Sequence, residues 1–202
     1  MEKKKINIIL LDLMDTIIPD PFFPAVKKLC GSMTDFSQWI NPRAYLKFEM
    51  GMITVEEYGE IFFKNPECAK NAPFTFSQFQ KQLLITPEPY PDVLEFIREY
   101  YKKIPLHLAS NYSSWIHRHI EKLCLKKYFT GEFISYKIGT RKPTKKFFRY
   151  IINNTNLTAK EMLFIDDQKD NVRMAKELGF QIILAKDNWP DQAKMLLRTT
   201  DT

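Results

Sequence analysis

Runs of apolar residues recur five times along the chain, and patterns typical of amphipathic helices separate most of them. Each run is nearly continuous in apolar residues, which is typical of parallel strands buried on both faces. Because strands alternate with helices, the pattern predicts an α/β fold with a doubly wound, mostly parallel, Rossmann-like sheet. The runs are INIILLD (6–12), IPLHLAS (104–110), EFISYKI (132–138), EMLFIDD (161–167) and FQIILA (180–185).

Residues that favour helix ends mark several of the predicted helices. Thr158 and Glu161 have the spacing of a capping box, and Pro91 stands at the start of the helical pattern DVLEFIREYY. Gly179 follows an apolar helical face and indicates a stop there. These signals support helices between the predicted strands.

The stretch over 19–89 has a different pattern, because it holds no strong strand-like run and is bracketed by prolines. Two pairs with capping-box spacing precede apolar helical faces in it: Thr54 with Glu57, and Thr75 with Gln78. The pattern predicts a mostly helical insertion over 19–89, placed after the first strand. The α/β core domain is then formed by 1–18 and 90–202.

The composition is that of a globular protein, since 45% of the 202 residues are hydrophobic. No run of about 18 uncharged apolar residues is present, and no small-residue cleavage site follows the basic N-terminus. We therefore expect no membrane association and no export. The three cysteines lack CxxC spacing, which favours reduced thiols in a cytoplasmic location and argues against a structural zinc.

The net charge of +6 is concentrated between Glu132 and Glu161, where basic residues occur without an acid. Such a segment either guides an anionic ligand or forms a solvated helix face, and we favour the solvated face for most of its residues. Phe147 and Phe148 have the spacing of core positions and no nucleic-acid-binding signature appears, so no nucleic-acid partner is expected. The basic residues are Lys137, Arg141, Lys142, Lys145, Lys146, Arg149 and Lys160.

Two predicted strands end in carboxylates, the first at Asp12 and the fourth at Asp166 and Asp167. The carboxyl ends of parallel strands meet at one edge of a sheet, so these side chains are expected to lie close together. Carboxylates in so small a volume require a cation or bound protons, and oxygen ligands without a nearby histidine are typical of Mg²⁺. Helix capping is the alternative interpretation for Asp15 and Asp170, but it explains Asp12 and Asp167 together poorly.

A third predicted strand ends in Ser110 and Asn111, which supply a hydroxyl and backbone N–H groups. These are groups that bind phosphate, although both residues are also common in turns. Lys142 precedes Pro143, which keeps the chain extended before another predicted helix, so the lysine is expected to project toward the strand ends. Each signal is weak alone, and the order and spacing of all four elements are what make the pattern specific.

This order resembles that of the haloacid dehalogenase-like hydrolase superfamily over essentially the whole chain. Asp12, Ser110, Lys142 and the Asp166–Asp167 pair match the four motifs of that superfamily. The helical insertion resembles the cap domain of the superfamily, and its position is that of a cap that closes over a small substrate.

The resemblance implies a Mg²⁺-dependent hydrolase that acts on a small phosphorylated molecule. Asp12 is then the nucleophile and forms an aspartyl-phosphate. Lys142 and Ser110 then bind the transferring group, with help from Thr16 and Asn111. The resemblance also implies a magnesium site formed by Asp12, the main-chain carbonyl of Met14 and Asp167, with Asp166 and Asp170 in supporting positions.

Met14 departs from the usual phosphatase pattern, in which the residue two positions after the nucleophile is an Asp that acts as general acid and base. Loss of such a group typically lowers a rate by about 10²–10⁴-fold. Asp15 is a candidate for the missing catalytic proton donor and is equally consistent with capping the turn. Dehalogenases of the superfamily also lack this Asp, but they do not generally keep a metal-binding acid pair such as the one in FIDD.

One branch of the superfamily, the plant-type flavin mononucleotide hydrolases, resembles this chain in having Asp-x-Met-Asp-Thr at its first motif. Aromatic residues of the insertion, with Phe23 and Trp39 the ones to test, then either stack on a flavin ring or, as we favour, form the core of a small helical domain. The similar segments are DLMDTIIPDPF, GMITVEEYGEIFF, SNYSSW, RKP and FIDDQKDNV.

Three functional hypotheses follow. The leading one is a Mg²⁺-dependent phosphomonoester hydrolase for a small metabolite, with flavin mononucleotide among the candidate substrates. The second is a metal-independent carbon–halogen hydrolase, against which the acid pair argues. The third is a catalytically silent phosphate-binding or regulatory protein that lost turnover with Met14.

Overall fold

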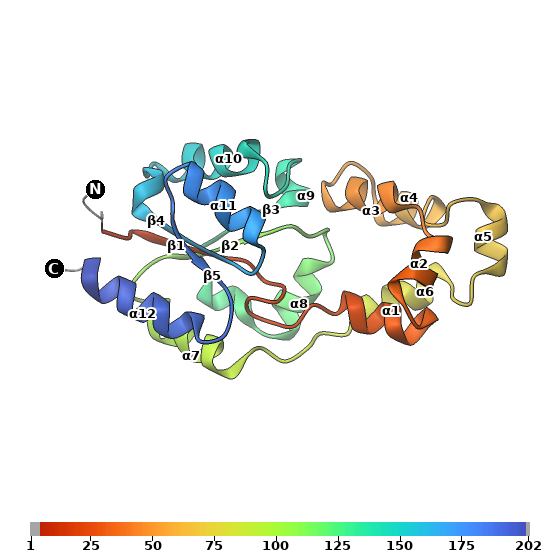
Figure 1. Ribbon diagram of the computed structural model, residues 1–202, viewed down its shortest axis with the longest axis horizontal. Helices are drawn as coiled ribbons and strands as arrows, with labels where there is room; N and C mark the ends of the chain where they lie inside the picture. The colour runs from red at the N-terminus through yellow and green to blue at the C-terminus, as the bar shows by residue number, and fades with distance from the viewer. Residues whose placement is uncertain (1–4, 201–202) are drawn as a thin grey trace.

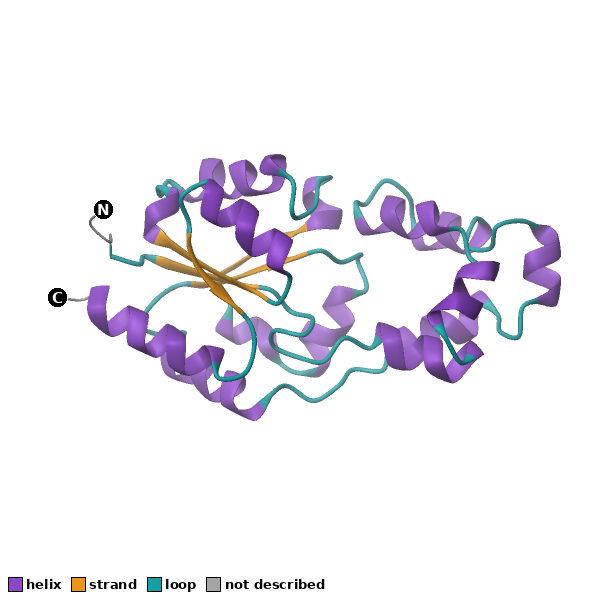
Figure 2. Ribbon diagram, viewed as in Figure 1, coloured by secondary structure: helices purple, strands orange, loops and turns teal. Residues whose placement is uncertain are grey.

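The core of the protein is a sheet of five parallel strands, seen in a computed structural model that describes residues 5–200 (Figures 1 and 2). The strand order is β3-β2-β1-β4-β5, so the chain extends the sheet from β1 first to one side and then to the other. This doubly wound α/β arrangement confirms the predicted fold class. The strands are β1 (Ile8–Leu11), β2 (Leu106–Ser110), β3 (Gly131–Ile134), β4 (Met162–Asp166) and β5 (Gln181–Leu184).

The side chains of β1 alternate between two separate cores. Ile8 and Leu10 belong to one core with residues of α10 and α11, whereas Ile9 and Leu11 belong to another with residues of α7, α8 and α12. Figure 1 shows these two groups of helices on opposite faces of the sheet. None of the four side chains is more than 3% exposed, which explains why the strand is a continuous apolar run.

The helices of the core domain begin and end close to the predicted signals. Pro91 lies in the first turn of α7, and Gly179 follows α11 with a φ of +94°, a value that favours glycine. None of the helices within residues 5–200 combines the length and apolar character needed to cross a bilayer. The helices are α7 (Pro91–Tyr100), α8 (Ile116–Lys122), α9 (Ser135–Ile138), α10 (Lys145–Thr155), α11 (Lys169–Glu177) and α12 (Trp189–Thr200), with 3-10 turns η1 (Leu125–Tyr128) and η2 (Ala159–Glu161).

Residues 22–83, which we call the helical segment, lie beyond the carboxyl edge of the sheet (Figure 1). The capping boxes predicted at Thr54 and Thr75 are present at the starts of α4 and α6. The centre of the segment is a cluster of aromatic rings, in which Phe36 contacts Phe62, Phe74 and Phe79. The helices are α1 (Phe22–Cys30), α2 (Met33–Trp39), α3 (Pro42–Glu49), α4 (Val55–Glu60), α5 (Pro66–Asn71) and α6 (Phe76–Leu83).

The apolar run over 132–138 is wrong as a single strand. The strand β3 ends at Ile134, and the residues that follow form the short helix α9. The side chain of Ser135 accepts a hydrogen bond from the backbone N–H of Tyr112 and donates one to the carbonyl oxygen of Glu49. These two distant partners hold Ser135 where the strand ends, and the apolar pattern contains no sign of them.

Candidate active site

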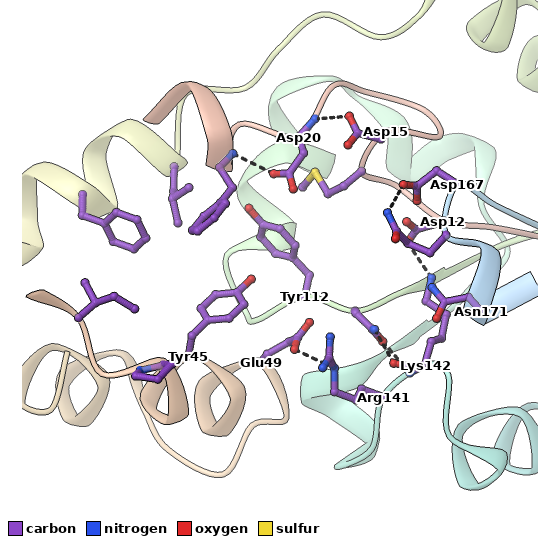
Figure 3. Close-up of a pocket in the computed structure, with 18 of the residues that line it drawn as sticks. Asp12, Asp15, Asp20, Tyr45, Glu49, Tyr112, Arg141, Lys142, Asp167 and Asn171 are labelled. Carbon is purple, nitrogen blue, oxygen red and sulfur yellow. Dashed lines mark hydrogen bonds and ion pairs between the residues drawn. The ribbon is translucent and has the colours of Figure 1, made fainter. Parts of the chain in front are cut away.

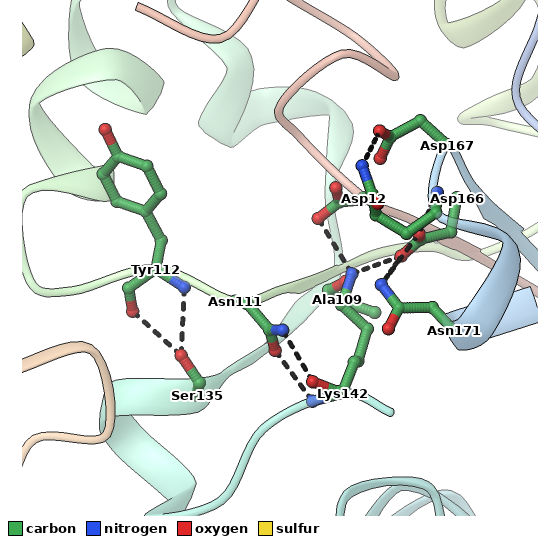
Figure 4. Close-up of polar contacts among 10 residues, drawn as sticks. Asp12, Ala109, Asn111, Tyr112, Ser135, Lys142, Asp166, Asp167 and Asn171 are labelled. Atoms are coloured by element: carbon green, nitrogen blue, oxygen red, sulfur yellow. Dashed lines mark hydrogen bonds and ion pairs between the residues drawn. The ribbon is translucent and has the colours of Figure 1, made fainter. Parts of the chain in front are cut away.

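Three carboxylates meet at the carboxyl edge of the sheet, where β1 and β4 end side by side (Figure 4). The backbone N–H of Asp12 donates to the carbonyl oxygen of Ile165, 3.0 Å away, which fixes the end of β1 against β4. Asp12, Asp166 and Asp167 each offer an oxygen atom, and these atoms lie within 4.8 Å of one another. The parallel pairing of β1 with β4 thus brings together carboxylates that are more than 150 residues apart in the sequence.

Lys142 places a buried ammonium group between two of these carboxylates. Its Nζ lies 2.9 Å from Oδ1 of Asp12, forms an ion pair with Asp166 and donates to the carbonyl oxygen of Ala109 at 2.6 Å. The backbone of Lys142 is held by Asn111, whose side-chain amide exchanges two hydrogen bonds of 2.8 and 2.9 Å with it. The lysine is 1% exposed and satisfied by three acceptors, so its charge has a fixed position.

Asp166 serves as a rigid support because its two oxygens have protein donors. Oδ1 accepts from the backbone N–H of Gln168 at 2.8 Å, and the side-chain amide of Asn171 reaches both oxygens. The structure does not place Asp170 in this supporting set. Its side chain is 67% exposed and pairs with Arg173, so the helix α11 turns Asn171 rather than Asp170 toward the site.

Burial has the largest effect on the pKa values of Asp12 and Asp167 in the acidic cluster. It raises the pKa of Asp12 from the ordinary 3.8 to about 6, although the ion pair with Lys142 and the nearby Ser110 hydroxyl oppose the change. Burial, together with the charges of Asp12 and Asp166, raises the pKa of Asp167 from 3.8 to about 7. Burial lowers the pKa of Lys142, but the two carboxylates outweigh it and raise the pKa above its ordinary value, so the lysine is charged.

The loop after β1 arranges the residues that follow Asp12. Asp15 has a φ of +52° and its Oδ1 accepts a hydrogen bond from the backbone N–H of Asp20, so its side chain holds the turn. Thr16 and Ser110 are at most 1% exposed, and neither side chain lines the cavity described next. Within residues 5–200, the Thr16 hydroxyl has no hydrogen-bond partner.

A cavity of about 420 Å³ opens above the acidic cluster and extends into the helical segment (Figure 3). Asp12, Met14, Asn111, Lys142 and Asp167 line its end at the sheet. Its middle is lined by polar residues and its far end by aromatic and aliphatic ones. The polar residues are Asp20, Tyr45, Glu49, Tyr112 and Arg141, and the apolar ones are Phe22, Phe36, Ile40, Pro42, Tyr58, Phe62, Phe79 and Leu83.

One family model, described as haloacid dehalogenase-like hydrolase, matches residues 35–185. This span exceeds half of the chain and includes three of the four motifs. The chain belongs to the haloacid dehalogenase-like hydrolases. The membership confirms the predicted resemblance and makes the protein a hydrolase.

Two relatives and one solved structure show how this hydrolase compares with other members. Flavin mononucleotide hydrolase 1 of Arabidopsis thaliana is 29% identical over 187 residues, which are 88% of this chain and 71% of the relative. D-ribitol-5-phosphate phosphatase of Bacteroides thetaiotaomicron is 29% identical over 77 residues, 37% of each protein. A haloacid dehalogenase family enzyme of Bacteroides thetaiotaomicron, solved with magnesium and inorganic phosphate, has a TM-score of 0.72 and 20% identity and covers 93% of this chain and 98% of its own.

The aromatic residues of the hydrolase's cavity are only partly those expected. Phe22, Tyr45 and Phe62 line the cavity, but Phe23 and Trp39 do not, and Phe23 is 59% exposed on the outer side of α1. Neighbouring helix positions point in different directions, so the pair of Phe22 and Phe23 divides between cavity and solvent. The sequence shows that aromatic residues are plentiful but does not show which of them face inward.

Four polar residues of the site were not predicted as site residues, although Asp20, Tyr112 and Arg141 lie in segments that resemble the flavin mononucleotide hydrolases. Glu49 and Tyr112 are more than 60 residues apart and are held near each other by Ser135 of α9, which forms hydrogen bonds with the backbone of both. Asp20 stands among prolines, and Arg141 stands in a basic stretch otherwise interpreted as a solvated face. That interpretation fits the exposed members of the stretch, which are Lys137, Lys145, Lys146, Arg149 and Lys160.

Proposed function

We propose that the protein is a Mg²⁺-dependent phosphomonoester hydrolase that acts on a small phosphorylated metabolite. The observation that carries the proposal is the convergence of Asp12, Asp166 and Asp167 around the buried ammonium of Lys142, at the floor of a cavity. A phosphate group needs positive charge, and the carboxylates of this site need it as well. Lys142 alone does not neutralise three carboxylates, so the site favours a divalent cation.

The donor atoms of the cluster suit Mg²⁺, because they are carboxylate oxygens without a nitrogen or sulfur ligand among them. We propose that Asp12, Asp167 and the main-chain carbonyl of Met14 hold the ion, and that Asp166 supports them through Lys142. The hydrogen bonds from Gln168 and Asn171 to Asp166 support this division of roles. When bound, the ion supplies positive charge that offsets the repulsion between the nucleophile and the phosphate oxygens.

Asp12 is proposed as the nucleophile. One of its carboxylate oxygens forms a bond to phosphorus as the bond to the ester oxygen breaks, which leaves an aspartyl-phosphate and releases the alcohol. Water then attacks phosphorus and restores the carboxylate with release of inorganic phosphate. Lys142 stabilises the charge of the transferring group, and Ser110, Asn111 and Thr16 stay predicted contributors to its binding.

The departing alcohol requires a proton, and Met14 does not supply one. The prediction that Asp15 donates it stays open to test, with the carboxyl oxygen that does not accept the hydrogen bond from Asp20 as the candidate group. The alternative function, a silent phosphate-binding protein, is favoured by one observation: the side chain that lines the cavity two positions after Asp12 is a thioether.

Two features support a substrate with a ribityl phosphate, such as flavin mononucleotide. The flavin mononucleotide hydrolase and the D-ribitol-5-phosphate phosphatase act on molecules that share this group. The cavity is polar near the acidic cluster and aromatic farther away, an order that matches phosphate, hydroxylated chain and flat ring.

Purified protein with magnesium is the direct test. We expect phosphate release from p-nitrophenyl phosphate, ribitol 5-phosphate or flavin mononucleotide, with no release by Asp12→Asn and no release in the presence of a chelator. Binding of a phosphate analogue such as fluoroberyllate without turnover of any phosphate ester in a broad panel selects the silent binding protein. Release of halide from a haloacid in the presence of chelator contradicts both.

A further inference from the structure

The middle of the cavity is a belt of polar side chains with an unusual arrangement of charge. We use the name polar belt for Asp20, Tyr45, Glu49, Tyr112 and Arg141, which lie between the acidic cluster and the aromatic end (Figure 3). Asp20 comes from the first connection between the sheet and the helical segment, Glu49 from the end of α3, and Arg141 from the loop before α10. The belt is thus assembled from both parts of the molecule.

Arg141 is the single basic side chain of the belt, and its position is set from two directions. It directly precedes Lys142, whose backbone is fixed by the side-chain amide of Asn111. Its Nε lies 3.0 Å from Oε2 of Glu49, a carboxylate that is 4% exposed. The carbonyl oxygen of Glu49 accepts a hydrogen bond of 2.7 Å from Ser135, which anchors the end of α3 to the core domain.

The remaining donors of this guanidinium face the cavity without a protein partner. Among residues 5–200, Glu49 pairs with Nε of Arg141, and the two terminal amino groups of the guanidinium have no protein partner. Arg141 lines the cavity, and Figure 3 shows its tip directed between Glu49 and Lys142. A guanidinium held at one nitrogen and open at the other two presents a fork of donors in a fixed direction.

The charges of the belt indicate what this fork binds. The belt contains one guanidinium and the two carboxyl groups of Asp20 and Glu49, so a second anionic group on the substrate meets more negative than positive charge. Hydroxyl groups fit better, because each accepts a hydrogen bond from an arginine and donates one to a carboxylate. The chemistry of the belt therefore matches a neutral, hydroxylated chain that lies next to the phosphate.

We propose that Arg141 determines substrate specificity by donating hydrogen bonds to hydroxyl oxygens of the leaving group, and that Glu49 is a positioning residue that holds the guanidinium. This inference rests on the proposed phosphomonoesterase activity and adds to it the residues that recognise the part of the substrate beyond phosphorus. Since Glu49 belongs to the helical segment, recognition of the hydroxylated chain requires the segment to lie against the core domain.

The test compares two kinds of substrate, with and without hydroxyl groups in the leaving group, in the same variants. For Arg141→Gln we expect kcat/KM for ribitol 5-phosphate and for flavin mononucleotide to fall by about 10–100-fold, as for loss of hydrogen bonds from a charged donor. For p-nitrophenyl phosphate, which has no hydroxyl groups, we expect a change of less than about threefold. Glu49→Gln keeps an acceptor near Nε, so we expect a smaller loss in the same direction, mainly in KM.

Two further variants serve as controls for a general loss of structure. Arg141→Lys keeps the charge but not the fork, and we expect it to restore only part of the lost activity on the hydroxylated substrates. Arg149→Gln alters an exposed arginine of the same basic stretch, on α10, and is expected to leave the hydrolysis of all three substrates unchanged. Melting curves of all variants show whether each is folded.

The possible outcomes distinguish a failure of this inference from a failure of the proposed phosphomonoesterase function. No turnover of any phosphate ester by the wild-type protein overturns the proposed function. A wild-type protein that hydrolyses phosphate esters of other alcohols but neither ribitol 5-phosphate nor flavin mononucleotide overturns the role of Arg141. Equal losses on all three substrates in folded Arg141→Gln, or no loss on any, overturn it as well.

Discussion

The carboxyl edge of the sheet buries charges, whereas the helical segment buries aromatic rings. At the edge, Lys142 and Asp166 are at most 1% exposed and each has several directed partners. In the segment, Phe36, Phe62 and Phe79 are at most 2% exposed and meet one another at several different angles. These side chains are about equally buried in the two regions, but different forces hold them in place.

The difference shows how function and stability are divided in this fold. A buried charge costs several kcal/mol unless its partners lie in particular directions, so an arrangement of charges has a single geometry. Buried rings are stabilised by the area that they remove from water, and this contribution is not directional. Substitutions at the carboxyl edge are therefore expected to lower the activity, whereas substitutions in the helical segment are expected to lower the stability.

The largest effect is expected from Lys142→Met, which removes the charge at the centre of the edge. Phosphatase activity should fall by about 10²–10³-fold or more, because the transferring group loses its fixed positive charge. Asp12 and Asp166 are left buried without their cation, so the free energy of unfolding should also fall, by about 3 kcal/mol. Activity assays with magnesium and urea denaturation at pH 7.5 measure the two losses.

A second variant shows whether the lysine's position or its charge matters. Lys146→Met removes an exposed charge four residues away, and it should change neither quantity by more than the experimental error. Retention of most of the activity by Lys142→Met would contradict the central place that we give to this ammonium group.

Periodicity and end signals in the sequence were sufficient to predict a doubly wound α/β sheet and a run of helices after its first strand. The two-residue alternation of β1 between two cores produces a continuous apolar run, so the strand is visible without any tertiary knowledge. The run over 132–138 misled because nothing in it marks the end of β3. Its end depends on contacts of Ser135 with Glu49 and Tyr112, which lie far away in the chain.

The acidic cluster was predictable for a similar reason: parallel strands that end in carboxylates bring them to one edge. The choice between Asp170 and Asn171 was not, since it depends on the rotation of α11 about its axis. One residue changes that rotation by about 100°. Arg141 and Glu49 could not be paired in advance either, because their contact depends on how the helical segment docks on the core domain.

The next largest effect is expected in the helical segment, from Phe74→Ala. Phe74 is 3% exposed, stacks on Phe36 at a ring distance of 5.5 Å and does not line the cavity. Its truncation should lower the free energy of unfolding by about 3 kcal/mol through lost burial and a remaining void. At temperatures where the variant is folded, kcat should change little, which is the reverse of the result expected for Lys142.

Phe23→Ala is the matched control, because Phe23 is 59% exposed in the same segment. Its stability should stay within about 0.5 kcal/mol of the wild-type value. Equal destabilisation by the two substitutions would show that the aromatic cluster is not a packed core.

The contact between the two regions is expected to give a smaller effect, in Gly51→Ala. Gly51 follows α3 and has a φ of +66°, and a Cβ atom there would lie 2.1 Å from the carbonyl oxygen of Tyr136 in α9. Gly139→Ala provides the comparison, since Gly139 has a φ of +65° and its Cβ would meet nothing within 4 Å.

The strain of a positive φ costs about 1–2 kcal/mol in both variants, so the difference between them isolates the close approach of the two regions. We expect Gly51→Ala to be less stable than Gly139→Ala by about 1 kcal/mol or more. It should also have a higher KM for substrates that reach the polar belt. Equal stability of the two variants would mean that the end of α3 does not press against α9 in solution.

The last effect is expected from pH, and it concerns the charges at the carboxyl edge of the sheet. Raised pKa values mean that Asp12 and Asp167 hold protons more tightly in the folded than in the unfolded metal-free protein. Their contribution to stability is therefore complete below about pH 4 and is lost as pH rises through about 6 and 7. The slope is at most about 1.4 kcal/mol per pH unit for each carboxyl group, and less for Asp167 because it is partly exposed.

Magnesium should reverse this trend, because it binds the ionised carboxylates. We expect magnesium to raise the melting temperature more at pH 8 than at pH 5.5. Asp167→Asn should flatten the pH dependence of the metal-free protein and remove most of the magnesium effect, whereas Asp170→Asn, at an exposed position paired with Arg173, should do neither. A magnesium effect that survives Asp167→Asn unchanged, or that grows toward pH 5.5, would place the ion away from the edge of the sheet.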